Sequence, residues 1–442
     1  MCLWGYKSDA FKCWSLFEYL GAIMVNASSE ACGGDDAFST PEWINEDFFK
    51  RILEKCENES VEIHRLRLSS GTASTDNYAS ILYRAKINYS LCSQATQEKL
   101  RSFVMKTEPF VEGLKKDKMN EVPLFETEVR MYTKVLPKIE AKLREFSDRT
   151  VLAPKLITYS LEAPRYIVFE DLGIEGYLPI NNRPCSLEEI KLALKKLAKI
   201  HAISFQMAQT DNHELATFDK TFINTIDIAN FPVLRDGIKL MKEVISDQPD
   251  LRKYLPHFER AELFLIPKVL DLLNAPKNGK RSGIQVLNHG DFHVKNLMVK
   301  YVDNKLKELI LLDYQVSMFG SPAIDLHYAF TMMYSPSMRM ENMDELLYYY
   351  TKNFQDTLHS VQYKGHIPTI TELRAEMRDY RHWGLYLVST LLCFNYAFME
   401  GIGMNEIVES EDARRALLTN SKILDELRIL LPRFLYLGCF EE

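Results

Sequence analysis

The first half of the chain holds short stretches in which apolar and polar residues alternate, a pattern typical of β-strands that cover one face of a core. The clearest stretch is Glu62–Leu68, which the turn-rich segment Ser69–Asn77 separates from the next one. Because short strands joined by turns tend to pair with their sequence neighbours, these stretches predict a small, mainly antiparallel sheet. Its five predicted strands cover residues 62–68, 81–87, 102–106, 156–159 and 166–169.

A helical spacing of apolar residues predicts two helices in the same half of the chain. The segment Pro41–Trp43 opens the first one, whose apolar positions are Phe49, Ile52 and Leu53. The apolar positions of the second one are Phe125, Val129, Tyr132 and Leu136. Proline lacks a backbone N–H and clashes with the preceding helical turn. We therefore expect the second helix to end at Pro137.

After Asp171 the pattern becomes mostly helical. Ser186 and Glu189 form a capping box, and the stripe that follows it consists of Ile190, Leu194, Leu197 and His201. A short hairpin over residues 299–301 and 309–312 interrupts the helices. The uncharged run Trp383–Met399 is short for a membrane span and contains three polar residues, which favours a buried helix.

This order of elements predicts an α+β fold with two lobes. The N-lobe, residues 41–170, would be a small antiparallel sheet with one main helix, and the C-lobe, residues 171–442, would be larger and mostly helical. Residues 1–40 look like an appended flexible tail, because the stretch from Asn26 is small and polar.

Composition excludes some classes of protein. The 442 residues are 46% hydrophobic and 26% charged, which is globular rather than disordered. A formal net charge of −7 argues against a protein that mainly binds nucleic acid or anionic lipid. The eight cysteines are scattered without a CxxC pair, so we expect reduced, mostly buried thiols. Glu18 interrupts the apolar run near the N-terminus, so no signal peptide is expected, and we predict a cytoplasmic protein without membrane insertion.

The residues that carry chemistry lie in two nearby segments, His289–Asn296 and Leu309–Gln315. An Asp five residues before an Asn, followed by a second Asp after a hairpin, is the layout of a phosphoryl-transfer loop. Asp291 would accept the proton of an attacking hydroxyl. Asn296 and Asp313 would offer oxygen atoms to Mg²⁺, which prefers hard oxygen ligands.

The sequences HGDFHVKNLM, from His289, and LLDYQVSMFGSPAIDLHYAF, from Leu311, resemble the ecdysteroid kinase-like (CHK kinase-like) family. This family belongs to the small-molecule branch of the protein-kinase-like fold, with the choline and aminoglycoside kinases. The resemblance covers the chain from about Pro41 to its end. It implies that Lys106 holds the α- and β-phosphates of ATP and that Glu128 is its helix partner, with Glu126 as a competitor.

The same resemblance implies further roles. The segment Glu170, Asp171 and Leu172 would be the hinge between the lobes, whose backbone binds adenine, and Gly71 would lie in the turn that covers the phosphates. Asp325 would brace the catalytic loop, and His201 is interpreted as a satisfied core histidine. The chain departs from the family at two places. The phosphate-covering turn has one glycine where a second is common, and His293 stands where many relatives carry Trp.

The leading hypothesis is an ATP- and Mg²⁺-dependent kinase that phosphorylates an alcohol on a small apolar molecule, such as an ecdysteroid or a xenobiotic. Aromatic and methionine residues after Tyr328 motivate the apolar acceptor. The alternatives are a choline or ethanolamine kinase, and a pseudokinase that binds nucleotide or steroid without turnover. The oligomeric state stays open, with a monomer as the simplest expectation.

Overall fold

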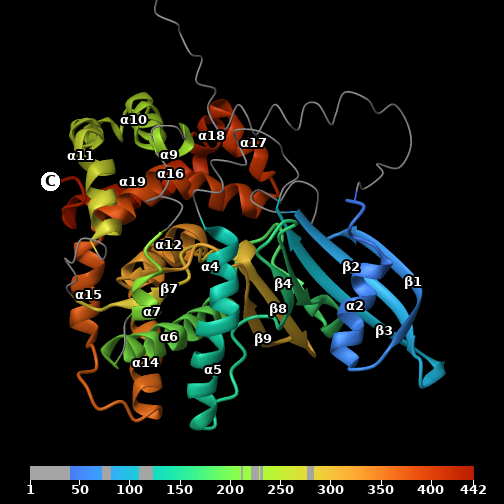
Figure 1. Ribbon diagram of the computed structural model, residues 1–442. Coiled ribbons are helices and arrows are strands. Elements are labelled where there is room, and N and C mark those ends of the chain that lie inside the picture. Colours follow the sequence, from blue (N-terminus) through green and yellow to red (C-terminus); the bar gives the residue numbers. More distant parts are fainter. Residues whose placement is uncertain are drawn as a thin grey trace, which may run out of the picture.

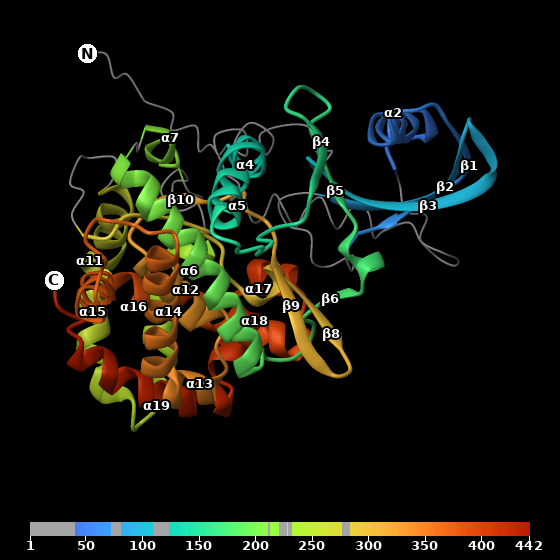
Figure 2. The same ribbon diagram turned by 90° about the horizontal axis from the view of Figure 1, so that it is seen from below.

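The computed structural model describes residues 40–71, 81–108, 123–210, 213–220, 228, 232–275 and 283–442. The predicted tail, apart from its last residue, lies outside the described residues, as does most of the predicted phosphate-covering turn. The chain forms a curved sheet on one side and a body of helices on the other, which is the two-lobed, protein-kinase-like architecture (Figures 1 and 2).

The N-terminal sheet has five strands in the order β1-β2-β3-β5-β4, and every neighbouring pair is antiparallel. Helix α2 (Glu46–Glu57) packs on one face through Phe48, Phe49, Ile52 and Leu53. All five predicted strands are present, but the third is longer than predicted because its outer half pairs with β2. The strands are β1 (Val61–Ser70), β2 (Ile81–Leu91), β3 (Gln94–Thr107), β4 (Leu156–Ser160) and β5 (Tyr166–Glu170).

The prediction that the second helix ends at Pro137 is wrong. Helix α4 (Leu124–Arg130) continues through a π-helical turn, η1 (Met131–Val135), into α5 (Leu136–Glu145). Hydrogen bonds in a π-helical turn span five residues, so the turn changes the bonding pattern just before the proline. Pro137 then lies in the first turn of α5, where proline is tolerated.

Helix α6 (Leu187–Thr210) begins at the predicted capping box: the Glu189 N–H donates to the Ser186 hydroxyl, and the Ser186 N–H donates to the Glu189 carboxylate. The predicted hairpin is also present, as β8 (Leu297–Val302) and β9 (Lys305–Leu311). A strand that the sequence pattern did not indicate, β6 (Tyr177–Pro179), pairs with β8 and completes a three-stranded sheet.

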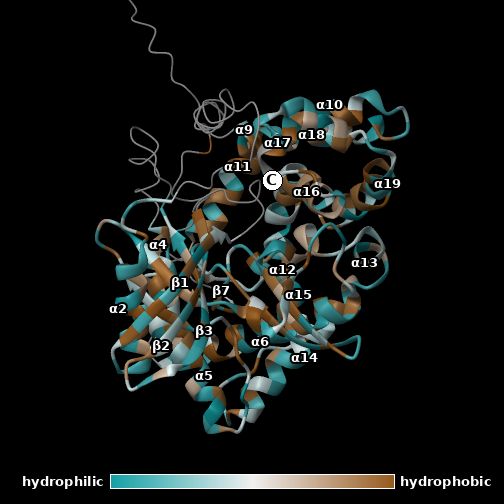
Figure 3. Ribbon diagram, turned by 90° about the vertical axis from the view of Figure 1, so that its right-hand side faces the viewer, coloured by the Kyte–Doolittle hydropathy of each residue, from teal (hydrophilic) through white to brown (hydrophobic). Residues whose placement is uncertain are grey.

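The helical lobe is built around α12 (Ala323–Met332) and α16 (Arg381–Glu400), with α6 and α14 (Met343–Ser360) beside them. Figure 3 shows hydrophobic residues, in brown, along α6 and α12. The other long helices are α10 (Gly237–Asp247), α11 (Leu255–Asn274), α15 (Ile370–Asp379), α18 (Glu411–Leu418) and α19 (Ser421–Tyr436). Short helices are α7 (His213–Ala216), α9 (Pro232–Arg235), α13 (Pro336–Glu341) and α17 (Met404–Glu409).

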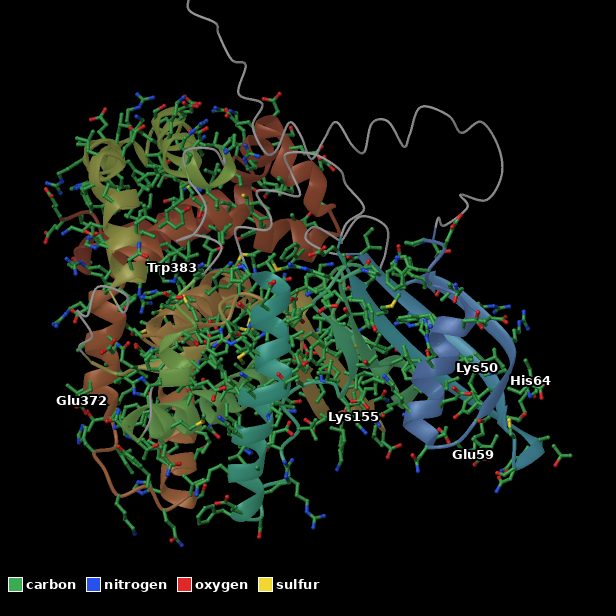
Figure 4. All side chains as sticks on the ribbon, viewed as in Figure 1. Lys50, Glu59, His64, Lys155, Glu372 and Trp383 are labelled. Atoms are coloured by element: carbon green, nitrogen blue, oxygen red, sulfur yellow. The ribbon has the colours of Figure 1, made fainter. Side chains whose placement is uncertain are left out.

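The uncharged run Trp383–Met399 forms most of α16, which is buried among its neighbours, as predicted. Figure 4 shows Trp383 inside the helical lobe, where its indole N–H donates to the Ile324 carbonyl at 3.1 Å. In the part of the chain that the structure describes, no helix has the length and apolar character needed to cross a membrane. The described cysteines are all free thiols; Cys185, Cys393 and Cys439 are buried, whereas Cys56 and Cys92 are exposed.

Candidate active site

The loop between β7 (Val286–Asn288) and β8 carries Asp291 with its carboxylate held from three directions. The Tyr328 hydroxyl donates to Oδ1 at 2.7 Å, Asn296 Nδ2 donates to Oδ2 at 3.1 Å, and His293 Nε2 lies 3.2 Å from Oδ2. Burial raises the pKa of Asp291, but the His293 ring and the Tyr328 hydroxyl outweigh burial. The pKa of this carboxyl therefore lies well below its usual range, and Asp291 is ionised at neutral pH.

A backbone contact determines which nitrogen of the His293 ring carries the proton. The Lys295 N–H donates to His293 Nδ1 at 3.1 Å, so Nδ1 is the acceptor and Nε2 carries a proton. His293 Nε2 can then donate to Asp291. The histidine that departs from the family pattern therefore orients the carboxylate instead of lying apart from it.

A buried aspartate on α12 fixes the backbone of this loop. Asp325 accepts the backbone N–H groups of His289, at 2.6 Å, and Gly290, at 2.9 Å. His201 Nε2 lies 3.2 Å from Asp325, and its Nδ1 lies 2.7 Å from the Tyr350 hydroxyl. Both His201 and Asp325 are fully buried. These contacts agree with a bracing role for Asp325 and a structural role for His201.

Gly290 allows the loop to pass close to the segment that follows β9. Its φ is +85°, and an added Cβ would lie 2.1 Å from the backbone oxygen of Val316. Any side chain at this position must therefore move one segment away from the other, because Cβ–oxygen contacts this short do not occur in proteins.

We expect Gly290→Ala to lower kcat/KM by about 10²-fold, since a displacement near 1 Å in an active site can have that effect. Gly438→Ala is the matched control: Gly438 also has a positive φ, of +68°, but its nearest non-neighbouring atom would be 3.3 Å from an added Cβ. Steady-state kinetics and thermal unfolding of both variants would check this. Equal loss of activity in the two variants would contradict the prediction.

Lys106, near the end of β3, connects the two lobes. Its ammonium donates to Glu128 Oε2 at 2.7 Å, to Asp313 Oδ1 at 2.9 Å and to Gln315 Oε1 at 3.0 Å. Burial lowers the pKa of Lys106, but the carboxylates of Asp313 and Glu128 outweigh it and raise that pKa above its usual value. The side chain is therefore a buried ammonium ion. Glu126, the competitor for the helix position, instead pairs with Arg165 at 3.0 Å.

Asp313 follows β9 and has a left-handed backbone, with φ of +62°. Such a conformation costs about 1–3 kcal/mol for a residue other than glycine and is concentrated at functional sites. Its Oδ2 accepts a hydrogen bond from Gln315 Nε2 at 3.2 Å. The preceding residue ties this segment to the catalytic loop: the Leu312 N–H donates to the Asn296 carbonyl, and His289 Nε2 lies 2.9 Å from the Leu312 carbonyl. Asp291 and Asp313 thus lie on two loops that are bonded to each other.

The oxygen atoms that this pair of loops can offer to a metal fit Mg²⁺. Asn296 uses its Nδ2 to donate to the carbonyl oxygen of Asp291 at 2.9 Å, as well as to the Asp291 carboxylate. Its Oδ1 atom is thereby the part of the amide left to face a ligand. Asp313 contributes a partly exposed carboxylate. An amide oxygen and a carboxylate are hard ligands of the kind that Mg²⁺ takes together with phosphate oxygens.

The residues predicted to bind the nucleotide base have side chains that are already engaged by the protein. Asp171 is buried and accepts from Arg84 Nε at 2.9 Å, from the Ser102 hydroxyl at 2.7 Å and from the Gly173 N–H at 3.0 Å. Glu170 Oε1 accepts the Lys155 N–H at 2.7 Å. Contact with adenine here would therefore come from the backbone.

Two other predicted nucleotide residues have clear structural explanations. Leu172 packs in a small apolar cluster with Tyr177 and Ile310. The Gly71 N–H donates to the Leu82 carbonyl at 2.8 Å, and an added Cβ would lie 2.8 Å from the Leu82 Cβ. Glycine at position 71 is thus required by the close approach of β1 and β2, and its N–H is used within the sheet.

Two site residues were not indicated by the sequence reasoning in these roles. Tyr328 was placed in an apolar stretch, yet its hydroxyl binds Asp291. Gln315 ends the second motif segment, where the sequence alone gives it no role, yet it contacts both Lys106 and Asp313. A signal for Tyr328 exists in retrospect, because it lies about one helical turn after the bracing Asp325 and so shares its side of α12.

Several solved structures are similar to this chain at low sequence identity. An ethanolamine kinase from Plasmodium vivax is 14% identical, with a TM-score of 0.39, and the match covers 92% of this chain and 98% of that one. An aminoglycoside phosphotransferase from Streptomyces rimosus is 12% identical, with a TM-score of 0.29 and coverage of 78% and 99%.

A thermostable aminoglycoside phosphotransferase mutant, in a ternary complex with ADP and hygromycin B, is 12% identical, with a TM-score of 0.30 and coverage of 83% and 98%. No curated protein matches the sequence significantly. A family model, in contrast, matches residues 74–363, which is more than half of the chain. On that match the chain belongs to the ecdysteroid kinase-like family, a family of small-molecule phosphotransferases.

Proposed function

We propose that this protein transfers the γ-phosphoryl group of ATP to an alcohol group of a small, apolar molecule such as an ecdysteroid or a xenobiotic. The observation that carries the proposal is the joined pair of loops. One loop holds an ionised Asp291, and the other holds Asp313 against the Lys106 ammonium. A proton acceptor and a site for phosphate charge are therefore adjacent, as phosphoryl transfer to a hydroxyl requires.

In the proposed reaction, Asp291 accepts the proton of the acceptor hydroxyl while that oxygen bonds to the γ-phosphorus. The bond between the γ-phosphorus and the bridging oxygen breaks, and ADP leaves. Lys106 would turn from Asp313 toward phosphate oxygens and keep its contact with Glu128. Asn296 and Asp313 would hold Mg²⁺, which neutralises phosphate charge when bound.

The surroundings of Asp291 support an uncharged acceptor. The Phe398 ring of α16 is buried and lies 5.6 Å from the His293 ring, so an aromatic surface adjoins the catalytic loop. The Lys295 ammonium lies 5.6 Å from the centre of the same Phe398 ring. The face of this ring that could attract a cationic acceptor such as choline therefore already faces a cation. A neutral apolar alcohol does not depend on that ring face for a cation–π contact.

We expect purified protein with Mg·ATP to phosphorylate neutral steroid alcohols with a higher kcat/KM than choline or ethanolamine. The assay would follow product mass over a panel of steroid and amino alcohols. The Asp291→Ala variant serves as the control for contaminating kinases. Preferred phosphorylation of choline or ethanolamine would overturn the apolar-acceptor proposal. Nucleotide binding without phosphorylation of any acceptor would favour the pseudokinase alternative.

A further inference from the structure

Helix α16 contains a buried side-chain amide whose oxygen has no hydrogen-bond partner among the described residues. The side chain of Asn395 is 2% exposed, and no described residue offers a hydrogen bond to its Oδ1 atom. Buried side-chain amides in folded proteins almost always have hydrogen-bond partners, because an unpaired one loses its contacts with water without compensation. Such an exception points to a partner outside the described residues where the unpaired atom also lies near the catalytic loop.

The position of Asn395 on α16 places it on the side of the catalytic loop. Gly384 marks that face, because an added Cβ there would lie 2.7 Å from His327 Nδ1 of α12. Asn395 lies about three helical turns further along and therefore returns to the same face. Phe398, about one turn beyond Asn395, lies against His293. The adjacent Tyr396 points to another side, where its hydroxyl donates to Glu426 Oε2 at 2.7 Å.

We propose that Asn395 binds a second polar group of the acceptor, which rests on the proposed function above. Its Oδ1 would accept a hydrogen bond from a hydroxyl that is not the one phosphorylated. The Phe398 ring beside the loop offers an apolar surface to the rest of the acceptor. The acceptor class that fits this arrangement is an apolar skeleton with at least two hydroxyl groups, and Asn395 determines which of them is required.

The variant that tests this proposal is Asn395→Leu, which keeps the size of the side chain and removes its polar atoms. Ser389→Ala is the matched control. Ser389 is also on α16, is also buried, and its hydroxyl also lacks a partner among the described residues. Ser389 lies six residues before Asn395 and therefore on a different face of the helix, and its backbone oxygen lies near Gly237 of α10. The control removes an unpaired buried hydroxyl from the same helix without changing the proposed acceptor site.

The kinetic test uses Mg·ATP with 20-hydroxyecdysone and with ecdysteroids that each lack one of its hydroxyls. For the unmodified protein we expect kcat/KM to be roughly ten- to hundredfold lower on one analogue than on the parent compound, because a site that binds a hydroxyl rejects the analogue that lacks it. On the parent compound, the kcat/KM of Asn395→Leu should be lower than that of the unmodified protein by a similar factor, mainly because KM rises. On that analogue, the two proteins should have the same kcat/KM. Affinity for Mg·ATP should stay unchanged. An equal loss of kcat/KM on every acceptor would overturn the proposal.

Thermal unfolding without acceptor gives an independent readout. Asn395→Leu should keep or raise the Tm, because an unpaired buried amide is replaced by an apolar group. A Tm lower by several degrees, with Ser389→Ala unchanged, would show that Asn395 holds the fold and would overturn the proposal. If the unmodified protein phosphorylates no ecdysteroid, the proposed function itself fails. If it does so and Asn395→Leu discriminates among the analogues as the unmodified protein does, only the role of Asn395 fails.

Discussion

Replacing Asp291 with alanine is expected to lower turnover by about 10²–10⁴-fold while leaving Mg·ATP affinity nearly unchanged. The carboxylate of Asp291 contacts Tyr328, His293 and Asn296, whereas the Lys106 ammonium contacts Glu128, Asp313 and Gln315. Its proposed contribution is therefore to accept the proton that leaves the acceptor hydroxyl. Calorimetry of Mg·ATP binding, beside a turnover assay, measures the two effects separately.

Asp313→Ala should behave differently, because it should weaken Mg·ATP binding as well as turnover. Asp313 faces Lys106 and carries the carboxylate proposed to hold Mg²⁺ against phosphate. Lys106→Met should lower turnover by misplacing the phosphates, with a smaller effect on adenine contacts. Asp344→Ala, which removes an exposed carboxylate on α14, is the control for the substitution itself. Equal loss of nucleotide binding in the Asp291 and Asp313 variants would refute this division of roles.

The second large effect concerns stability: Arg339→Leu should lower the free energy of unfolding by about 3–5 kcal/mol. Arg339 of α13 is fully buried, and its Nη2 pairs with Glu426 Oε2 of α19 at 3.0 Å. It also donates to the carbonyl oxygens of Phe330 and Thr331, each at 3.2 Å, at the end of α12. Removing the guanidinium leaves the Glu426 carboxylate buried without its charge partner.

Urea unfolding of Arg339→Leu and of the double variant Arg339→Leu/Glu426→Leu measures this directly. The double variant should recover part of the lost free energy, because the uncompensated carboxylate is removed as well. The carbonyl groups at the end of α12 remain without their donor in both variants, so recovery should be incomplete. A change below about 1 kcal/mol in the single variant would show that this pair contributes no more than a surface ion pair.

Local sequence patterns were sufficient for the elements whose geometry depends on near neighbours. The capping box at Ser186 and the hairpin of β8 and β9 depend on residues a few positions apart, and both are present. The segments with Asp291 and Asp313 could be identified because their spacing along the chain reflects two loops joined by that hairpin. Lys106 and Glu128 could be matched only through the family resemblance, since nothing local marks a lysine on a strand as buried.

Long-range contacts explain what the sequence could not predict. Tyr328 lies 37 residues from Asp291 along the chain, and the apolar stretch around it gives no sign that its hydroxyl points to the loop. The local effect of proline favours a helix end at Pro137, but the π-helical turn before this residue lets the helix continue. The role of Gly71 depends on the distance between β1 and β2, which a single sequence does not contain.

The contacts of Lys106 also determine the order in which this site can be completed during synthesis. Glu128 lies 22 residues after Lys106, whereas Asp313 lies 207 residues after it. A nascent chain therefore carries Lys106 and Glu128 long before Asp313 leaves the ribosome, since domains generally fold from the N-terminus as they emerge. Glu128 is the partner that can neutralise the lysine in the newly made first lobe. With the roles proposed above, the phosphate site is complete only when the second lobe has folded against the first.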